Sequence, residues 1–372
     1  MNKKRSKILI VDDNPSNLRT LMEVLGDEFT VIAARSGEKA LTLANTEPRP
    51  DLILLDVMMP GMDGYEVCLR LKSNPDTWGI PVLFVTSLNE IEDEQRGLAF
   101  GAVDYITKPI QPDLVLARVR SQIELKSYRD HLEYLVCERT LELSRTQDAT
   151  IFTISNLAET RDPETGAHIR RTQHYVQMLA RFVATTPFAA ALKPQDIEML
   201  FKSAPLHDIG KIGIADHILL KPDKLTPEEF DTMKSHTLIG WRALSYAEQV
   251  LGSNSFLRYA SEIALTHHEK WDGSGYPHGL SGEDIPLSGR LMAVADVYDA
   301  LTSRRPYKPP FPHAVAAKMI IDGRGRHFDP NIVDAFIALE SEIQQVLETI
   351  NDGPTGNAGL GNVPTQCYRL AS

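Results

Sequence analysis

The first third of the chain alternates short aliphatic runs with amphipathic segments. Residues 7–11 form an aliphatic run that ends in two aspartates, and similar runs occur at 30–33, 52–55, 82–85 and 103–106. Runs without polar interruption are typical of strands buried on both faces of a parallel sheet. Asn14 and Pro15 favour an N-cap and a first-turn proline for a helix that ends near Leu25. Five strands alternating with helices predict a doubly wound α/β domain with a five-stranded parallel sheet over residues 1–124.

The next stretch runs from residue 112 to the region of residue 161 with a helical pattern and no convincing stop signal. Leu125, Tyr128, Leu132 and Leu135 follow a 3-4-3 spacing with polar residues between them, which is typical of a short heptad seam. One interpretation is a coiled-coil linker over residues 125–150 that joins two copies and passes rearrangements of the first domain to the second. The alternative is a single amphipathic helix along one domain. The seam favours the coiled coil, and with it a homodimer.

Residues 151–348 have helical patterns throughout and predict an all-α bundle as the second domain. We expect a helix to restart at Asp162 and Pro163, another to follow Pro205, and a third to span 256–266. Closing helices are expected at 311–321 and 330–347. Gly, Asn, Pro and Thr dominate the end of the chain, so residues 349–372 are predicted to be a disordered tail.

Composition narrows the functional classes. The 372 residues are 42% hydrophobic and 24% charged, as in a soluble globular protein of two or three domains. The net charge of −11 argues against a DNA or membrane-surface binder, because both partners are polyanionic. We expect no membrane insertion, since no apolar run reaches about 18 residues. Three scattered cysteines and the lack of a signal-peptide pattern predict a cytoplasmic protein.

Polar residues follow the predicted strands of the first domain. The carboxyl ends of parallel strands meet at one edge of the sheet, where such folds bind ligands. The residues at these ends are Asp12, Asp13, Asp56, Thr86 and Lys108. Three carboxylates with one lysine form a hard-oxygen site that suits Mg²⁺. Acidic helix N-caps are the alternative, which is plausible for Asp13 alone.

Histidines and carboxylates in the second half could meet inside a helical bundle. The candidate metal ligands are Glu164, His168, His207, Asp208, His236, His267, His268 and Asp296. Five of the eleven histidines fall into this set, which a random scatter explains poorly. The alternatives stay open for single residues: a half-exposed helix end for the histidine pair, and a helix-dipole role for Glu164. A His/Asp/Glu mixture without cysteine suits Fe, Mn or Ni better than structural zinc.

Four motifs of the second half resemble the HD-GYP family of cyclic dinucleotide phosphodiesterases. They lie at residues 161–168, 207–211, 267–277 and 296–308, and the resemblance covers 150–340. Residues 7–125 resemble response-regulator receiver domains, with matching motifs at 54–64 and 107–109. The receiver resemblance implies that a sensor histidine kinase phosphorylates Asp56. It also implies that Asp12, Asp13 and the Met58 carbonyl hold Mg²⁺, that Lys108 and Thr86 contact the phosphoryl group, and that Tyr105 is the aromatic switch.

The HD-GYP resemblance implies a bi- or trinuclear centre of Fe or Mn, with Ni as a further option. Two ions bridged by Asp208 would hold a hydroxide for in-line attack, and Lys211 would stabilise the charge that develops on the phosphate. The resemblance places substrate phosphates on Arg305 and Lys308, while Tyr276 could stack on guanine or dock a partner. In this family Glu164 accompanies a third metal. The predicted reaction is hydrolysis of cyclic di-GMP to pGpG and, with Glu164, onward to GMP.

Two rival functions remain at this point. The first is hydrolysis of another cyclic dinucleotide, such as cyclic GMP-AMP, because the metal motif does not select the base. The second is a phosphorylation-switched interaction module that binds diguanylate cyclases through the loop around Tyr276. A complete ligand set argues against a purely binding role. The sequence gives neither the sign of the effect of Asp56 phosphorylation nor the identity of the kinase.

Overall fold

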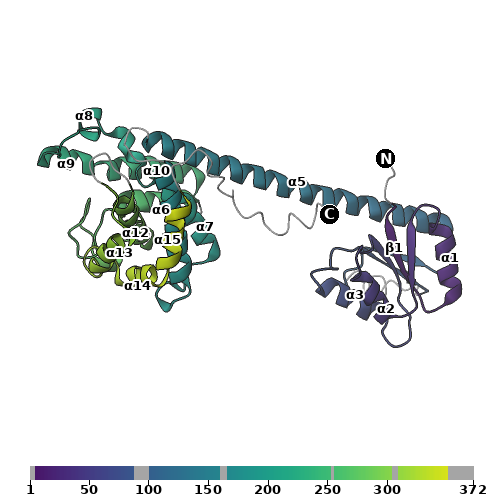
Figure 1. The fold of residues 1–372 in the computed structure, drawn as a ribbon. Helices are drawn as coiled ribbons and strands as arrows, with labels where there is room; N and C mark the ends of the chain where they lie inside the picture. Colours follow the sequence, from purple (N-terminus) through teal and green to yellow (C-terminus); the bar gives the residue numbers. More distant parts are fainter. Residues whose placement is uncertain (1–4, 88–99, 160–165, 253–254, 304–308, 351–372) are drawn as a thin grey trace. The chain divides into compact units, whose positions relative to one another are not determined.

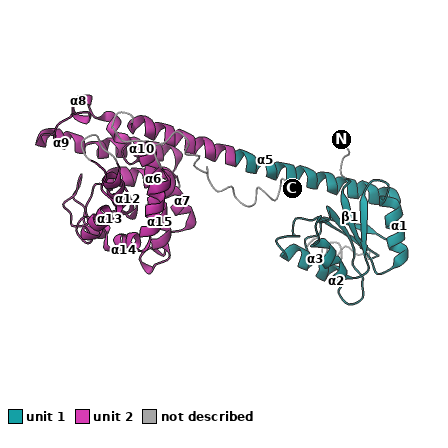
Figure 2. Ribbon diagram, in the orientation of Figure 1, with its two compact units in different colours: residues 1–140, 363–372 teal, residues 141–362 magenta. Residues whose placement is uncertain are grey.

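The computed structural model describes residues 5–87, 100–159, 166–252, 255–303 and 309–350 (Figure 1). Within these ranges the chain divides after Thr140 into two compact units (Figure 2). The predictions for Glu164, Arg305 and Lys308, the helix start at 162–163 and nearly all of the predicted tail fall outside the described residues.

Unit 1 contains the predicted doubly wound α/β domain. Its five parallel strands lie in the order β2-β1-β3-β4-β5. They are β1 (Lys7–Val11), β2 (Thr30–Ala34), β3 (Leu52–Asp56), β4 (Val82–Thr86) and β5 (Asp104–Thr107), so each of the last four ends one residue later than predicted. The helices are α1 (Pro15–Leu25), α2 (Gly37–Ala44), α3 (Gly64–Ser73) and the start of α5 (Pro112–Glu159).

Strands β1, β3 and β4 are buried along almost their whole length, as their aliphatic runs predicted, whereas the edge strands β2 and β5 are partly exposed. Leu9 and Val11 of β1 face one core, whereas Ile8 and Ile10 face the other. This alternation follows from the two-residue period of a strand, and it requires apolar side chains at every position. The side chain of Asn14 accepts a hydrogen bond from the backbone N–H of Ser16, which confirms the predicted N-cap of α1.

Helix α5 is a single helix of 48 residues, and the boundary between the units falls within it. This confirms the prediction that no stop signal occurs before the region of residue 161. Leu125, Tyr128 and Leu132 of the predicted seam are exposed in the single chain. The coiled coil and the homodimer stay predictions.

Unit 2 is a helical bundle, as predicted. Its longer helices are α6 (Gly166–Ala184), α10 (His236–Leu251), α11 (Phe256–Thr266) and α12 (Leu287–Thr302). Shorter helices are α7 (Pro194–Ser203), α8 (Asp216–Leu219), α9 (Pro227–Lys234), α13 (His313–Asp322), α14 (Pro330–Ala338) and α15 (Glu340–Thr349). The core between α6, α12 and α14 is built around Tyr175, Tyr298 and Phe336. The single closing helix expected at 330–347 was wrong, because the chain breaks into two helices at Leu339.

The helix expected to carry His207, Asp208 and Lys211 was also wrong. This segment consists of two 3-10 turns, η2 (Ala204–Leu206) and η3 (Ile209–Gly213), with His207 and Asp208 between them. Gly210 and Gly213 lower the helix propensity of this segment. Gly210 is also required by the packing of the segment. A Cβ atom at Gly210 would lie 1.9 Å from the carbonyl oxygen of His236. The missing side chain therefore lets η3 pack directly against the start of α10.

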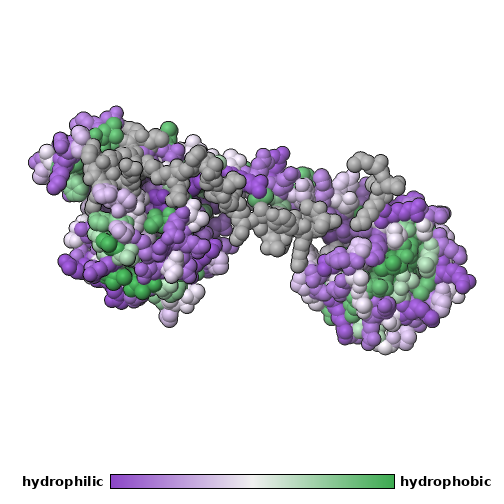
Figure 3. Space-filling view, in the orientation of Figure 1, coloured by the Kyte–Doolittle hydropathy of each residue, from purple (hydrophilic) through white to green (hydrophobic). Residues whose placement is uncertain are grey.

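Across the described part of the chain, no helix is long and apolar enough to span a membrane. Hydrophilic side chains predominate on the face shown in Figure 3, and apolar side chains gather in patches on each unit.

Candidate metal centre and phosphoryl-acceptor site

The predicted acidic residues of unit 1 converge at the carboxyl edge of the sheet. Asp12, Asp13 and Asp56 each place a carboxylate oxygen within 4.8 Å of the others. The Lys108 Nζ atom donates to Asp12 Oδ2 at 3.0 Å and to Asp56 Oδ2 at 2.9 Å. Burial raises the pKa of Asp56, and Lys108 opposes this shift. One lysine thus lies between two of three clustered carboxylates, an arrangement that leaves net negative charge for a divalent cation.

The remaining predicted receiver residues lie on neighbouring elements. Thr86 ends β4 and is buried, and its carbonyl accepts a hydrogen bond from the Lys108 backbone N–H at 2.8 Å. Tyr105 lies on β5, and the Arg118 guanidinium of α5 is 5.3 Å from the centre of its ring. The Met58 side chain is exposed. These positions agree with the expected edge of the sheet, while the roles of the residues stay predictions.

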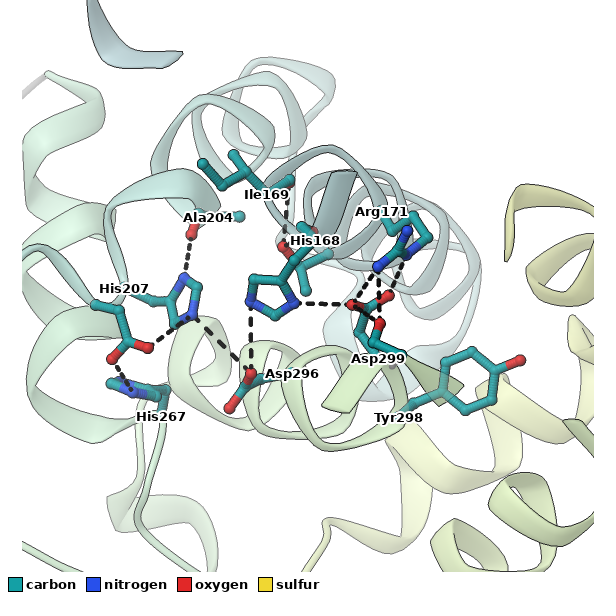
Figure 4. A network of polar contacts seen from close by, with 12 residues as sticks. His168, Ile169, Arg171, Ala204, His207, His267, Asp296, Tyr298 and Asp299 are labelled. Carbon is teal, nitrogen blue, oxygen red and sulfur yellow. Dashed lines mark hydrogen bonds and ion pairs between the residues drawn. The ribbon is translucent and has the colours of Figure 1, made fainter. Parts of the chain in front are cut away.

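In unit 2 the predicted ligands within the described residues meet in two adjoining groups. The first group is Asp208, His236, His267 and His268, and the second is His168, His207 and Asp296. Within each group the possible ligand atoms lie within 4.8 Å of one another. The two groups adjoin, because His207 Nε2 lies 3.4 Å from Asp208 Oδ2 and 4.0 Å from Asp296 Oδ1 (Figure 4).

Several separate elements bring these ligands together. His168 lies in the first turn of α6, His236 begins α10, His267 caps the end of α11, and Asp296 lies within α12. The close approach of α12 to the end of α11 depends on Gly289. A Cβ atom there would lie 2.0 Å from the Thr266 hydroxyl oxygen. The centre therefore depends on tight helix contacts as well as on the ligands themselves.

Three imidazoles are oriented by backbone carbonyl groups. The Nδ1 atoms of His207, His236 and His267 lie 2.7–3.0 Å from carbonyl oxygens of their own preceding turns. A carbonyl oxygen only accepts, so Nδ1 carries the proton and Nε2 presents a lone pair. The Nε2 atoms of these three histidines are buried and have no hydrogen-bond partner among the described residues.

The lone pairs face a carboxylate rather than a donor. His236 Nε2 and His267 Nε2 lie 3.2 and 3.5 Å from Asp208 Oδ1, yet neither pair forms a hydrogen bond. Buried acceptors that face each other destabilise a fold unless a cation or proton lies between them. Imidazole nitrogens with carbonyl-bonded Nδ1 atoms are the usual ligands of transition metals. The donor set therefore fits a metal centre.

Charges around the centre shift several pKa values. Burial alone would raise the pKa of Asp208, but Lys211 and His207 hold it well below its usual range. The Lys211 Nζ atom lies 2.7 Å from Asp208 Oδ2. Burial, reinforced by the neighbouring His267, places the pKa of His268 well below its usual range. Asp208 thus stays ionised and His268 neutral, which are the forms that bind metal.

Asp299, whose carboxylate contacts the ligand His168, was not among the predicted site residues. Asp299 is fully buried and lies 2.8 Å from His168 Nδ1, and it also accepts from Arg171 Nε at 2.6 Å and from the Ser303 hydroxyl at 2.9 Å (Figure 4). Burial alone would raise the pKa of Asp299, but His168 and Arg171 lower it to about 2. The spacing of three residues from Asp296 on one helix was the available signal.

The loop after His268 is held by another buried carboxylate. Glu269 accepts hydrogen bonds from the backbone N–H groups of His278 and Leu280 at 2.8 and 3.1 Å. This loop places the Tyr276 ring 4.7 Å from the His268 ring, with 32° between their planes. Tyr276 therefore lies beside the first ligand group, as its predicted role requires.

Comparisons with known proteins agree with this division. The HD domain family matches residues 153–332, and the response regulator receiver domain family matches residues 8–120. A Vibrio cholerae protein named "Probable cyclic di-GMP phosphodiesterase" is 51% identical over 93% of this chain and 80% of its own length. A cyclic di-GMP phosphodiesterase of Thermotoga maritima is 39% identical over 95% of both chains. The cyclic di-GMP phosphodiesterase response regulator RpfG of Xanthomonas campestris is 37% identical over 91% of this chain and 89% of its own.

Proposed function

We propose that this chain, which belongs to the family of response regulators that join a receiver domain to an HD-GYP domain, is a metal-dependent phosphodiesterase that hydrolyses cyclic di-GMP. The relatives support the reaction, since each carries that activity in its name. The buried Nε2 atoms around Asp208 support the metal dependence, and they are the observation that carries the proposal.

The residues would hold the ions as two sets that share one carboxylate. Asp208 Oδ1 faces His236 and His267, while Asp208 Oδ2 faces His207, so this carboxylate is suited to bridge the sets. Divalent cations held there would supply Lewis acidity towards water and phosphate oxygens. Nitrogen and oxygen donors without thiolates favour Fe or Mn, with Ni as a further option. Glu164 would serve a third ion, and with it hydrolysis would proceed beyond pGpG to GMP.

Residues of the chain would orient the substrate and stabilise charge. Lys211 places its ammonium at the edge of the centre, where it would stabilise the negative charge that builds on the phosphate oxygens. Arg305 and Lys308 would bind substrate phosphates, and Tyr276 would contact a guanine base. His168 and Asp296 would hold the second ion together with His207.

The receiver domain would control this hydrolysis. A sensor histidine kinase would transfer a phosphoryl group to Asp56, with Mg²⁺ held by Asp12, Asp13 and the Met58 carbonyl. Lys108 is already within hydrogen-bonding distance of the acceptor carboxylate. Thr86 and Tyr105 would respond to the phosphoryl group. The exposed seam of α5 would then pair two copies of the chain and transmit the change.

The decisive experiment is turnover of cyclic di-GMP by anaerobically purified protein loaded with Fe, Mn or Ni. Products would be separated by chromatography to distinguish pGpG from GMP. We expect hydrolysis that is lost on chelation and in His207→Ala, while exposed His131→Ala retains it. Cyclic GMP-AMP would be assayed in parallel, and faster turnover of that substrate would overturn the assignment to cyclic di-GMP. Absence of turnover with every metal would remove the enzymatic proposal.

A further inference from the structure

Helix α9 presents an aromatic ring and a cation beside the metal centre. Phe230 lies 6.2 Å from Tyr276, measured between ring centres, and the rings are nearly perpendicular. The Lys234 Nζ atom lies 5.0 Å from the centre of the Phe230 ring and 5.9 Å from that of Tyr276. Phe230 is 45% exposed, so part of its ring is open to solvent.

These side chains form a continuous series of contacts with the ligands. The Tyr276 ring lies tilted against the His268 ring, and the His268 ring lies 5.2 Å from that of His236. Lys234 ends α9 only two residues before His236, and the intervening Ser235 joins α9 to α10. The position of α9 is therefore tied to that of the first ligand group.

The start of α9 is fixed by its own sequence. Thr226 and Glu229 form a capping box, in which each side chain accepts a hydrogen bond from the backbone N–H of the other residue. Glu229 also pairs with Lys221 at 2.5 Å. A firmly capped helix can hold an exposed ring in place without burying it.

We infer that Phe230 and Lys234 are substrate-binding residues, in which the Phe230 ring stacks on a purine base and the Lys234 ammonium pairs with the adjoining phosphate. This inference rests on the proposed hydrolysis of cyclic di-GMP and deepens it. Base stacking on aromatic rings is favourable for any base, and a partly exposed ring keeps a face open for it.

The ion pair between Lys234 and Asp231 does not prevent Lys234 from binding a phosphate. Lys234 Nζ lies 2.6 Å from Asp231 Oδ1, but the Asp231 side chain is 72% exposed. An ion pair with an exposed carboxylate is weak, so the ammonium can exchange it for a phosphate oxygen.

The test compares Phe230→Ala, Phe230→Trp and Lys234→Met in the full-length, metal-loaded protein. For Phe230→Ala we expect KM for cyclic di-GMP to rise about tenfold, with a smaller change in kcat. Phe230→Trp should restore KM, because it restores a ring. Tyr246→Ala, which removes an exposed aromatic side chain from the far end of α10, is the matched control and should leave both constants unchanged.

Product inhibition separates the two contacts. Phe230→Ala should weaken inhibition by GMP about tenfold and leave inhibition by ribose 5-phosphate as in the wild type, since only GMP carries a base. Lys234→Met should weaken inhibition by both compounds. Wild-type KM and unaltered GMP inhibition in Phe230→Ala would overturn the inference while leaving the proposed function intact. Absence of turnover in the wild type would overturn both.

Discussion

Asp299 lies 2.8 Å from Nδ1 of His168, although the two residues are 131 positions apart in the chain. The pKa of Asp299 is about 2, since His168 and Arg171 outweigh the effect of burial, so its carboxylate is ionised at neutral pH and can only accept. The proton of His168 must therefore lie on Nδ1. This bond turns Nε2 of His168 towards Asp296, 3.8 Å away, and so towards the proposed metal.

Replacing Asp299 with asparagine should disturb the metal centre without changing its shape. The amide of Asp299→Asn can donate to Nδ1 of His168, and this would move the histidine proton to the nitrogen that faces the metal. We expect a loss of about 10- to 100-fold in metal affinity and turnover. Elemental analysis of the purified variant and its rate with cyclic di-GMP would measure both.

A control must separate this effect from a general loss of carboxylates. Asp334→Asn removes an exposed carboxylate that pairs with Arg324 on the surface of α14, and it should keep wild-type metal content. Thermal unfolding of metal-free Asp299→Asn would measure how much stability is lost when Arg171 no longer has its buried ionised partner. Full metal content in Asp299→Asn would contradict the proposed role of the bond.

The sequence predicted the strands, most of the helices and every candidate ligand within the described residues, but not how the ligands are supported. Aliphatic runs were sufficient to locate the five strands, because burial on both faces requires an uninterrupted apolar run in β1, β3 and β4, and shorter runs mark the partly exposed edge strands β2 and β5. The pairing of His168 with Asp299 depends on how α6 packs against α12, which no local pattern specifies. The 3-10 turns around Asp208 were missed for the same reason, since they arise from contact between Gly210 and α10.

Lys211 should contribute to the rate of hydrolysis more than to metal binding. Its ammonium lies 2.7 Å from Asp208 Oδ2 and is positioned to stabilise charge that develops on the phosphate. We expect Lys211→Met to lower kcat by roughly 10²-fold with wild-type metal content, whereas Lys211→Arg should recover part of the loss. Steady-state kinetics and elemental analysis on the same preparations would check this. Loss of metal in Lys211→Met would show that the lysine supports the ligands instead.

Control of hydrolysis by phosphorylation should require both the acceptor and the lysine that contacts it. Asp56→Asn removes the nucleophilic carboxylate, so labelling by acetyl phosphate should disappear and a phosphoryl mimic should no longer alter hydrolysis. Lys108→Ala should keep Asp56 but lose the contact at 2.9 Å. We expect its labelling to persist and its effect on hydrolysis to vanish. Asp27→Asn, an exposed change in the same unit, serves as the control. Equal hydrolysis with and without the mimic in the wild type would remove the regulatory proposal.

Unit 2 should lose stability on acidification partly through His327. Burial, reinforced by Lys270, lowers the pKa of His327 from 6.5 to about 4. The unfolded chain therefore binds this proton more readily, and stability is lost as the pH falls from 6.5 towards 4. His327→Gln removes the titrating group, so its melting temperature should fall less steeply over this range than that of the wild type. His131→Gln, an exposed change on α5, should follow the wild type. Circular dichroism melts of chelator-treated protein would measure the slopes, and parallel curves for wild type and His327→Gln would show that His327 does not contribute.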